Sequence, residues 1–280
     1  MYTINELCEE INLQAEVREE VLNLYKEINF AAYGEFMAGI MSAENPFESF
    51  ISLSKALGQD DRGLKILTIY LECARRCLKN YQESGIDKQI FIDTMKCFPR
   101  FIGEYKQIND CYGFPCPWWA YRQLNMTIFR LGELEFEFDS SQNAPLVNIH
   151  IPSDADFREQ NILNSLRQCK EFIAKYRPDF TSAKFTCHSW LLAPRLCDIL
   201  KKSSNIIRFQ RMFTITEVFE KETQYMDFIF HSGKNVALEN LPEKTSLQRG
   251  VKELLKRSIN LGAAYGIMKD ETLKRIEGKS

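Results

Sequence analysis

The sequence lacks the features that mark nucleic-acid-binding, membrane-spanning and secreted proteins. Its 36 lysines and arginines are outnumbered by 38 aspartates and glutamates, so the formal charge is -2 at pH 7 and no basic excess is available to bind a phosphate backbone. No segment approaches the roughly 20 uncharged apolar residues of a membrane helix. Residues 1–10 are acidic and contain no basic region followed by an apolar core, unlike a secretory signal. We therefore expect a soluble, cytoplasmic protein without a nucleic-acid or membrane partner.

The cysteines and histidines also lack the spacing of a disulfide framework or a metal site. The nine cysteines are odd in number, scattered, and mostly set among apolar residues, which favours reduced and buried thiols. Cys111 and Cys116, with four residues between them, are interpreted as loop packing rather than as a redox pair. The chain contains only three histidines. Two of them with a glutamate would suffice in number for a metal ion, but they have no tight spacing, so we expect no metal.

The periodicity of apolar residues changes once along the chain. At 280 residues the chain exceeds one average domain, so two domains are expected. Between residues 15 and 125 apolar residues recur at intervals of three and four, which is typical of amphipathic helices. Residues 111–119 contain two prolines and a glycine and break this pattern, and from about Phe129 apolar and polar residues alternate. The sequence predicts an all-helical domain over residues 1–120 and an α/β (α+β) domain with a mixed sheet over 121–280.

Two strands with one polar face each are predicted at the start of the second domain. Residues 130–139 alternate between polar and apolar, and a strand over 147–151 follows after a short turn-forming loop, so the two should pair antiparallel. In the second strand Asn148 and His150 share the polar face. The polar face of the first strand carries three carboxylates: Glu133, Glu135 and Glu137.

A helix over 157–176 and a strand over 184–192 come next, and this strand carries His188. A strand, a helix and a strand in that order normally form a right-handed crossover between parallel neighbours, so the strands of His150 and His188 should be adjacent. Two further strands near 209–219 and 225–231 are predicted to form a hairpin.

The order of these elements is similar to the core of the GNAT acyltransferase superfamily. More specifically, five segments resemble those of a bacterial family of N-acyltransferases that joins a helical N-terminal domain to a GNAT-like C-terminal domain: Arg130–Glu137, Asn148–Pro152, Cys187–Leu192, Ser204–Ile206 and Leu241–Arg249. The resemblance implies a GNAT-like mixed sheet in residues 121–280. It also implies an acyl-CoA donor, placed where two parallel strands splay apart, and a small-molecule amine as acceptor.

One loop departs from the superfamily pattern. The loop that normally cradles the donor pyrophosphate is glycine-rich, because bare backbone amides bind phosphate well. Here the matching segment, Ile151–Phe157, has no glycine and carries Asp154 and Asp156. We therefore predict that a donor pyrophosphate is held by the helix that opens further on, at Thr245, Ser246 and Arg249. The departure also leaves open an alternative function, a module that has lost catalysis and binds a ligand or partner between its domains.

Thr245 has a simpler interpretation as well. It has capping-box spacing to Gln248, so its first expected role is to cap that helix, and anion binding comes second.

His150 is the predicted general base, because the pKa of a free histidine lies near neutrality and carboxylates lie within reach across the hairpin. Glu135 is the expected orienting carboxylate, and a different register would substitute Glu133 or Glu137. Asn148 beside it is a candidate for substrate binding. The alternative is a core histidine with a satisfied hydrogen bond.

His188 is the second catalytic candidate. It lies between Cys187 and Ser189, but successive strand residues point to opposite faces, so neither neighbour is placed to act as a nucleophile with it. Trp119 and Arg122 are candidates for lining a substrate cleft between the two domains, or alternatively for an aromatic plug at that interface.

Overall fold

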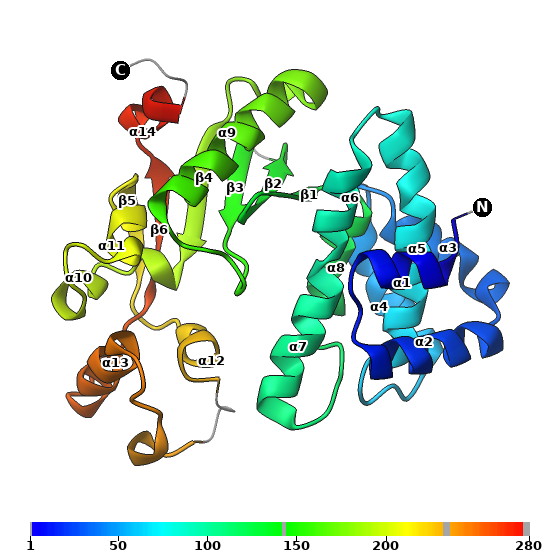
Figure 1. The fold of residues 1–280 in the computed structure, drawn as a ribbon, viewed down its shortest axis with the longest axis horizontal. Coiled ribbons are helices and arrows are strands. Elements are labelled where there is room, and N and C mark those ends of the chain that lie inside the picture. The colour runs from blue at the N-terminus through cyan, green and yellow to red at the C-terminus, as the bar shows by residue number, and fades with distance from the viewer. Residues whose placement is uncertain (1, 142–143, 232–235, 277–280) are drawn as a thin grey trace. The chain divides into compact units, whose positions relative to one another are not determined.

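The computed structural model describes residues 2–141, 144–231 and 236–276. The chain divides into two compact units, Met1–Arg130 and Leu131–Ser280 (Figure 1), which we call the helical unit and the sheet unit. The junction expected after residue 120 falls within a helix of the first unit, α8 (Pro117–Leu124).

The helical unit is organised around α5 (Leu64–Glu83), whose side chains are buried on most sides of the helix. In its N-terminal part every residue from Leu64 to Ala74 except Lys65 is buried, and a helix segment buried on all sides has to lie inside a bundle. Accordingly α5 contacts six of the other helices. The unit also contains α1 (Ile4–Glu10), α2 (Ala15–Glu27), η1 (Phe30–Tyr33), α3 (Gly34–Ile40), α4 (Pro46–Leu57), α6 (Lys88–Met95) and α7 (Cys97–Asn109).

The predicted break of the helical pattern over residues 111–119 is confirmed. The chain divides between α6 and α7, and Pro99 lies in the first turn of α7, where a missing amide hydrogen costs little. The helix α7 ends at Asp110, whose φ is 57°, and α8 begins with Pro117. Six of the nine cysteines, all but Cys111, Cys116 and Cys197, are buried.

A mixed sheet of six strands has the order β1-β2-β3-β4-β6-β5, and all of its strands except β1, which crosses the boundary at Leu131, lie within the sheet unit. The strands are β1 (Ile128–Leu131), β2 (Leu134–Asp139), β3 (Leu146–His150), β4 (Lys184–Ser189), β5 (Phe213–Phe219) and β6 (Ala263–Met268). The helix α9 (Glu159–Tyr176) connects β3 to β4, which are parallel neighbours. This confirms the crossover prediction and the mixed-sheet fold class.

The two faces of the sheet differ in polarity. One face packs on α9 (Figure 1), and Phe138 of β2 contacts Phe172 of α9 with ring centroids 5.6 Å apart. Because side chains alternate along a strand, the glutamates of β2 and the histidines of β3 and β4 lie on the opposite face.

Three expectations about the sheet unit were wrong. Residues 130–139 are not one strand, because Gly132, with φ 66°, turns the chain between β1 and β2. The expected strand near 225–231 is a helix, α12 (Tyr225–Phe230), which buries Tyr225, Ile229 and Phe230 along one side. The antiparallel partner of β5 is therefore β6, which lies between β4 and β5.

The segment between β4 and β6 builds a second apolar core beside the sheet. Its helices are η3 (Trp190–Leu192), α10 (Leu196–Ile199), α11 (Asn205–Gln210), α12, η4 (Leu238–Asn240) and α13 (Ser246–Lys256). The predicted capping box of α13 is confirmed, since Thr245 Oγ1 accepts the Gln248 amide and Gln248 Oε1 accepts the Thr245 amide, each at 3.1 Å. A further helix, η2 (Pro178–Phe180), precedes β4, and α14 (Asp270–Ile276) follows β6.

Candidate functional site

The parallel strands β3 and β4 stop pairing before either strand ends, which leaves an opening between them. Their pairing ends at Asn148 opposite Thr186, although both strands continue beyond that point. Thr186 Oγ1 donates a 2.6 Å hydrogen bond to Asn148 Oδ1, which ties the strands together at the last paired position. His150 and His188 each follow two residues later, so they lie on the same face at the two sides of the opening.

His150 is hydrogen-bonded to the carboxylate of Glu137. Its Nε2 lies 2.9 Å from Glu137 Oε2, and the two side chains are 25% and 18% exposed. Glu135 is the Cα partner of His150 in the register and is buried, with 2% exposure. The glutamate diagonal to His150 on the antiparallel pair is within reach of the ring. The orienting carboxylate is thus one of the two alternatives that the register had left open.

His188 also faces a carboxylate, one that sequence analysis missed. Its Nε2 lies 3.1 Å from Glu222 Oε1, and its ring lies 4.6 Å from that of Phe219 at the end of β5. The side chains of His188 and Glu222 are 47% and 33% exposed, so this pair is more open than the pair of His150. The only sequence signal for Glu222 is its position in the charged stretch Glu220–Glu222, between the two strands of the predicted hairpin.

The neighbours of His188 have structural roles. Cys187 points into the core, where burial raises the pKa of its thiol far above the ordinary value, so it is not a thiolate at neutral pH. Ser189 Oγ accepts the Leu191 amide and caps η3.

In the loop after β3, backbone amides that could bind a phosphate already donate hydrogen bonds to groups of the protein. The Asp156 amide donates to Glu133 Oε2 at 2.9 Å, and the Arg158 amide donates to Asp156 Oδ1 at 3.1 Å. The Ala155 amide bonds to Pro152 O. The pKa of the Asp156 carboxyl is lowered, first by its hydrogen bond with the Arg158 side chain. The loop therefore holds carboxylates where the superfamily pattern places an anion.

The other predicted phosphate site, at the start of α13, is exposed but partly closed by its own cap. Gln248 Oε1 accepts the amides of Lys244 and Thr245, and the Arg249 guanidinium donates to the carbonyls of Glu243 and Lys244. Ser246 is the first residue of the helix. A phosphate bound here would have to draw Arg249 away from these carbonyls.

Trp119 and Arg122 lie on α8 in the helical unit. The Arg122 guanidinium carbon is 4.2 Å from the Trp119 ring centroid, a cation–π contact, and Trp118 packs edge-on to Trp119. Their predicted part in substrate binding stays a prediction.

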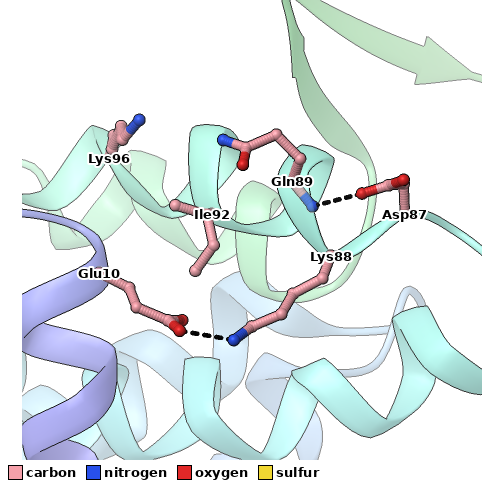
Figure 2. A pocket seen from close by; sticks show the side chains of 6 residues that line it. All are labelled: Glu10, Asp87, Lys88, Gln89, Ile92 and Lys96. Atoms are coloured by element: carbon pink, nitrogen blue, oxygen red, sulfur yellow. Dashed lines mark hydrogen bonds and ion pairs between the residues drawn. The ribbon is translucent and has the colours of Figure 1, made fainter.

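One cavity of the helical unit is lined mainly by charged side chains. It has a volume of about 410 Å³, and Figure 2 shows the Lys88–Glu10 ion pair and the Gln89 amide bonded to Asp87 within it. Ile92 and Lys96 complete the lining. Lys88 is paired with Glu10 and Lys96 with Asp93, and the six lining residues include no histidine or cysteine.

Within residues 2–141, 144–231 and 236–276, no group of three histidine, cysteine, aspartate or glutamate side chains is arranged to hold a metal ion. In the same ranges no helix is both long and apolar enough to cross a bilayer.

Two family models match the chain. Residues 2–126 match the N-acyltransferase N-terminal domain, and residues 128–268 match the GNAT-like C-terminal domain. A search of curated proteins finds no match.

Solved structures of acyltransferases share the fold. A complex with decanoyl-CoA and teicoplanin has a TM-score of 0.79 at 18% identity, covering 94% of this chain and 86% of that chain. A complex with CoA and 10C-teicoplanin has a TM-score of 0.77 at 18% identity and the same coverage. A mutant in complex with octanoyl-CoA has a TM-score of 0.75 at 17% identity, again with the same coverage. At these identities the likeness establishes the fold.

Proposed function

This chain belongs to the family that joins an N-acyltransferase N-terminal domain to a GNAT-like C-terminal domain, and from this premise we propose that it transfers an acyl group from an acyl-CoA thioester to an amine. The observation that carries the proposal is the pair of histidine–carboxylate contacts on the polar face, one on each side of the opening between β3 and β4. Amine acylation needs a proton acceptor at the attacking nitrogen, and a carboxylate-held imidazole is suited to that role.

His150 accepts the proton of the acceptor amine while the nitrogen attacks the thioester carbonyl carbon. Glu137 stabilises the positive charge that forms on the ring. Backbone amides released where β3 and β4 cease to pair are placed to stabilise the oxyanion. The carbon–sulfur bond then breaks, and His188, in its protonated form, donates a proton to the departing sulfur. His150 releases the amine proton to solvent and His188 regains a proton from solvent, so that the products are an amide and the CoA thiol.

The solved acyltransferases support a choice of donor and acceptor class. Their complexes contain decanoyl-CoA and octanoyl-CoA, so we propose a medium-chain acyl-CoA as donor. One complex also contains the glycopeptide teicoplanin, which supports a small-molecule acceptor with a free amine. Asn148 of β3 is the proposed acceptor-binding residue of the sheet unit, and Trp119 and Arg122 of α8 are the proposed acceptor-binding residues of the helical unit.

The donor pyrophosphate is proposed to bind away from the loop Ile151–Phe157. Glu133 already accepts a hydrogen bond from the Asp156 amide, and a negatively charged phosphate in this loop would be repelled by the carboxylates there. The start of α13, with Thr245, Ser246 and Arg249, remains the proposed binding site for the pyrophosphate. Calorimetry with decanoyl-CoA should show weaker binding in Arg249→Ala. Unchanged affinity would indicate that the pyrophosphate binds at another site.

A second candidate function is a module that binds acyl-CoA or another ligand without turnover. The observation that favours it is the same glycine-free loop, because donor binding in the usual mode needs open amides. Donor binding without any acyl transfer to a panel of amines would support this candidate.

The test of the proposed function uses decanoyl-CoA and a panel of small amines, with amide formation followed by mass spectrometry and CoA release by thiol titration. His150→Ala should lower turnover by about a hundredfold or more with donor affinity retained. His231→Asn is the matched control, because His231 ends α12 with φ 47°, a conformation that asparagine tolerates. Full turnover in a folded His150→Ala variant would remove His150 from the reaction and leave it a structural histidine.

A further inference from the structure

The turn that carries Glu222 is held in place by Asn260. Asn260 Nδ2 donates a 2.9 Å hydrogen bond to the Glu222 carbonyl and a second bond to the Glu220 carbonyl. The turn itself is closed by the Glu222 amide, which donates to the Phe219 carbonyl at 3.3 Å. The side-chain amide of Asn260 is therefore hydrogen-bonded to both ends of the segment that places the Glu222 carboxylate beside His188.

Asn260 is in turn oriented by Tyr225. The Tyr225 hydroxyl donates to Asn260 Oδ1, which fixes the side-chain amide so that its NH₂ group points at the turn. Tyr225 is fully buried, and burial raises the pKa of its phenol, so it keeps its proton as a donor at neutral pH. Because Tyr225 belongs to the second apolar core, the turn is linked to a rigid part of the fold.

The backbone brings these groups together at the paired ends of two strands. Phe219, the last residue of β5, is opposite Ala263, the first residue of β6. Gly262 has φ 74°, and a Cβ atom there would lie 2.7 Å from the Phe219 carbonyl oxygen. The chain before β6 can therefore approach the turn closely only with glycine at position 262.

We propose that Asn260 is a positioning residue for His188, acting through Glu222. A carboxylate at Nε2 favours the imidazole tautomer with the proton on Nε2, and this leaves Nδ1 as the nitrogen that exchanges a proton with substrate. When Asn260 is removed, the turn is free to shift, Glu222 moves from Nε2, and the ring loses its preferred tautomer. The catalytic consequence rests on the proposed function, but the effect on the tautomer does not.

The experiment is ¹⁵N NMR of the full chain labelled at histidine, which contains only three histidines, at about pH 8.5, above the range in which histidines usually titrate. Single His→Asn variants assign the three rings. In Asn260→Ala, the Nδ1 and Nε2 shifts of His188 should move towards those of a tautomer mixture and match those in Glu222→Gln. His150 should keep its shifts and serves as the internal control.

Tyr225→Phe is a second variant, which removes only the hydroxyl that orients Asn260. It should move the His188 shifts in the same direction by a smaller amount, and it keeps the inference testable if Asn260→Ala does not fold. Wild-type His188 shifts in whichever of the two variants is folded would overturn the inference.

Kinetics then test the link to catalysis. Asn260→Ala should lower kcat on the order of tenfold with little change in KM, but should cost almost nothing further in a Glu222→Gln background. Losses that simply add would show that Asn260 does not act through Glu222. If the NMR shifts change as expected and no acyl transfer is detected with any amine, the proposed function fails while the positioning role of Asn260 stands.

Discussion

At the scale of single residues, the chemistry of the site depends on which oxygen meets which ring nitrogen. Glu133, Glu135 and Glu137 occupy alternate positions in the sequence, which predicts all three on the polar face. In the structure, Glu133 and Glu137 have different partners. Glu133 accepts the Asp156 amide, whereas Glu137 bonds to His150. A substitution of Glu133 should therefore affect the loop after β3, whereas the same substitution of Glu137 should affect His150.

We expect Glu137→Gln to lower turnover by about tenfold, because it replaces a charge-assisted hydrogen bond to His150 with a neutral one and keeps the shape of the side chain. Glu217→Gln, on exposed β5 of the same sheet, is the matched control and should leave turnover unchanged. The measurement is kcat for amide formation. An equal loss in both variants would contradict a specific role for Glu137.

At the scale of secondary-structure elements, α2 and α5 are joined by one buried carboxylate. Glu72, 2% exposed, accepts hydrogen bonds from Tyr25 of α2 and from Arg75 and Arg76 of α5. Burial alone would raise the pKa of Glu72, but these hydrogen bonds outweigh it, so its pKa lies below the ordinary glutamate value of 4.5. A lowered pKa in the folded state means that ionised Glu72 stabilises the fold.

That stabilisation should be fully present above the ordinary carboxyl pKa and be lost as the pH falls through the lowered value. Glu72→Gln should therefore lower the free energy of unfolding by about 1–3 kcal/mol at pH 7, and by much less near about pH 3. Urea unfolding of the full chain at the two pH values measures this. Glu83→Gln, at the exposed end of α5, should cost at most about 0.5 kcal/mol at either pH. A loss from Glu72→Gln that is independent of pH would contradict the ionic explanation.

At the scale of the whole molecule, the groups proposed to act on the donor all belong to the sheet unit. These are the two histidines, the loop after β3 and the start of α13. A ligand that binds only the folded chain stabilises it by about 2.7 kcal/mol when its free concentration is about 100 times Kd. Decanoyl-CoA should therefore slow hydrogen exchange in β3, β4 and α13, as measured by mass spectrometry. Peptides from the N-terminal half of α5, with a buried core of their own, provide the comparison. Protection confined to α5 would contradict a donor site on the sheet unit.

Local patterns in the sequence determined much of this architecture. The change from helical periodicity to alternation near residue 126 separates the helical elements from the sheet, because each pattern reflects which side of a single element is buried. Alternation likewise placed His150 with Asn148 on one face, and the spacing of Thr245 and Gln248 predicted a cap that the structure contains.

Some elements carried no such signal. Tyr225–Phe230 is a short apolar run that suits a strand or a helix, and it becomes a helix because Tyr225 and Ile229 pack in the second core. Ala263–Met268 contains two alanines and a glycine, which have low β-propensity. It is a strand because it pairs with both β4 and β5, and Gly266 suits a position where a Cβ atom would make tight contacts of 3.1 Å with Leu192 and Phe213.

The sequence by itself determined the two kinds of unit and which residues share the polar face, since both follow from contacts between near neighbours. Only the tertiary structure decided which carboxylates meet the histidines. Glu137 reaches His150 through the strand register, and Glu222 reaches His188 from a turn beyond β5, after β6 has inserted between β4 and β5. Register and strand order depend on pairing between residues far apart in the chain, and no local pattern in one sequence specifies that pairing.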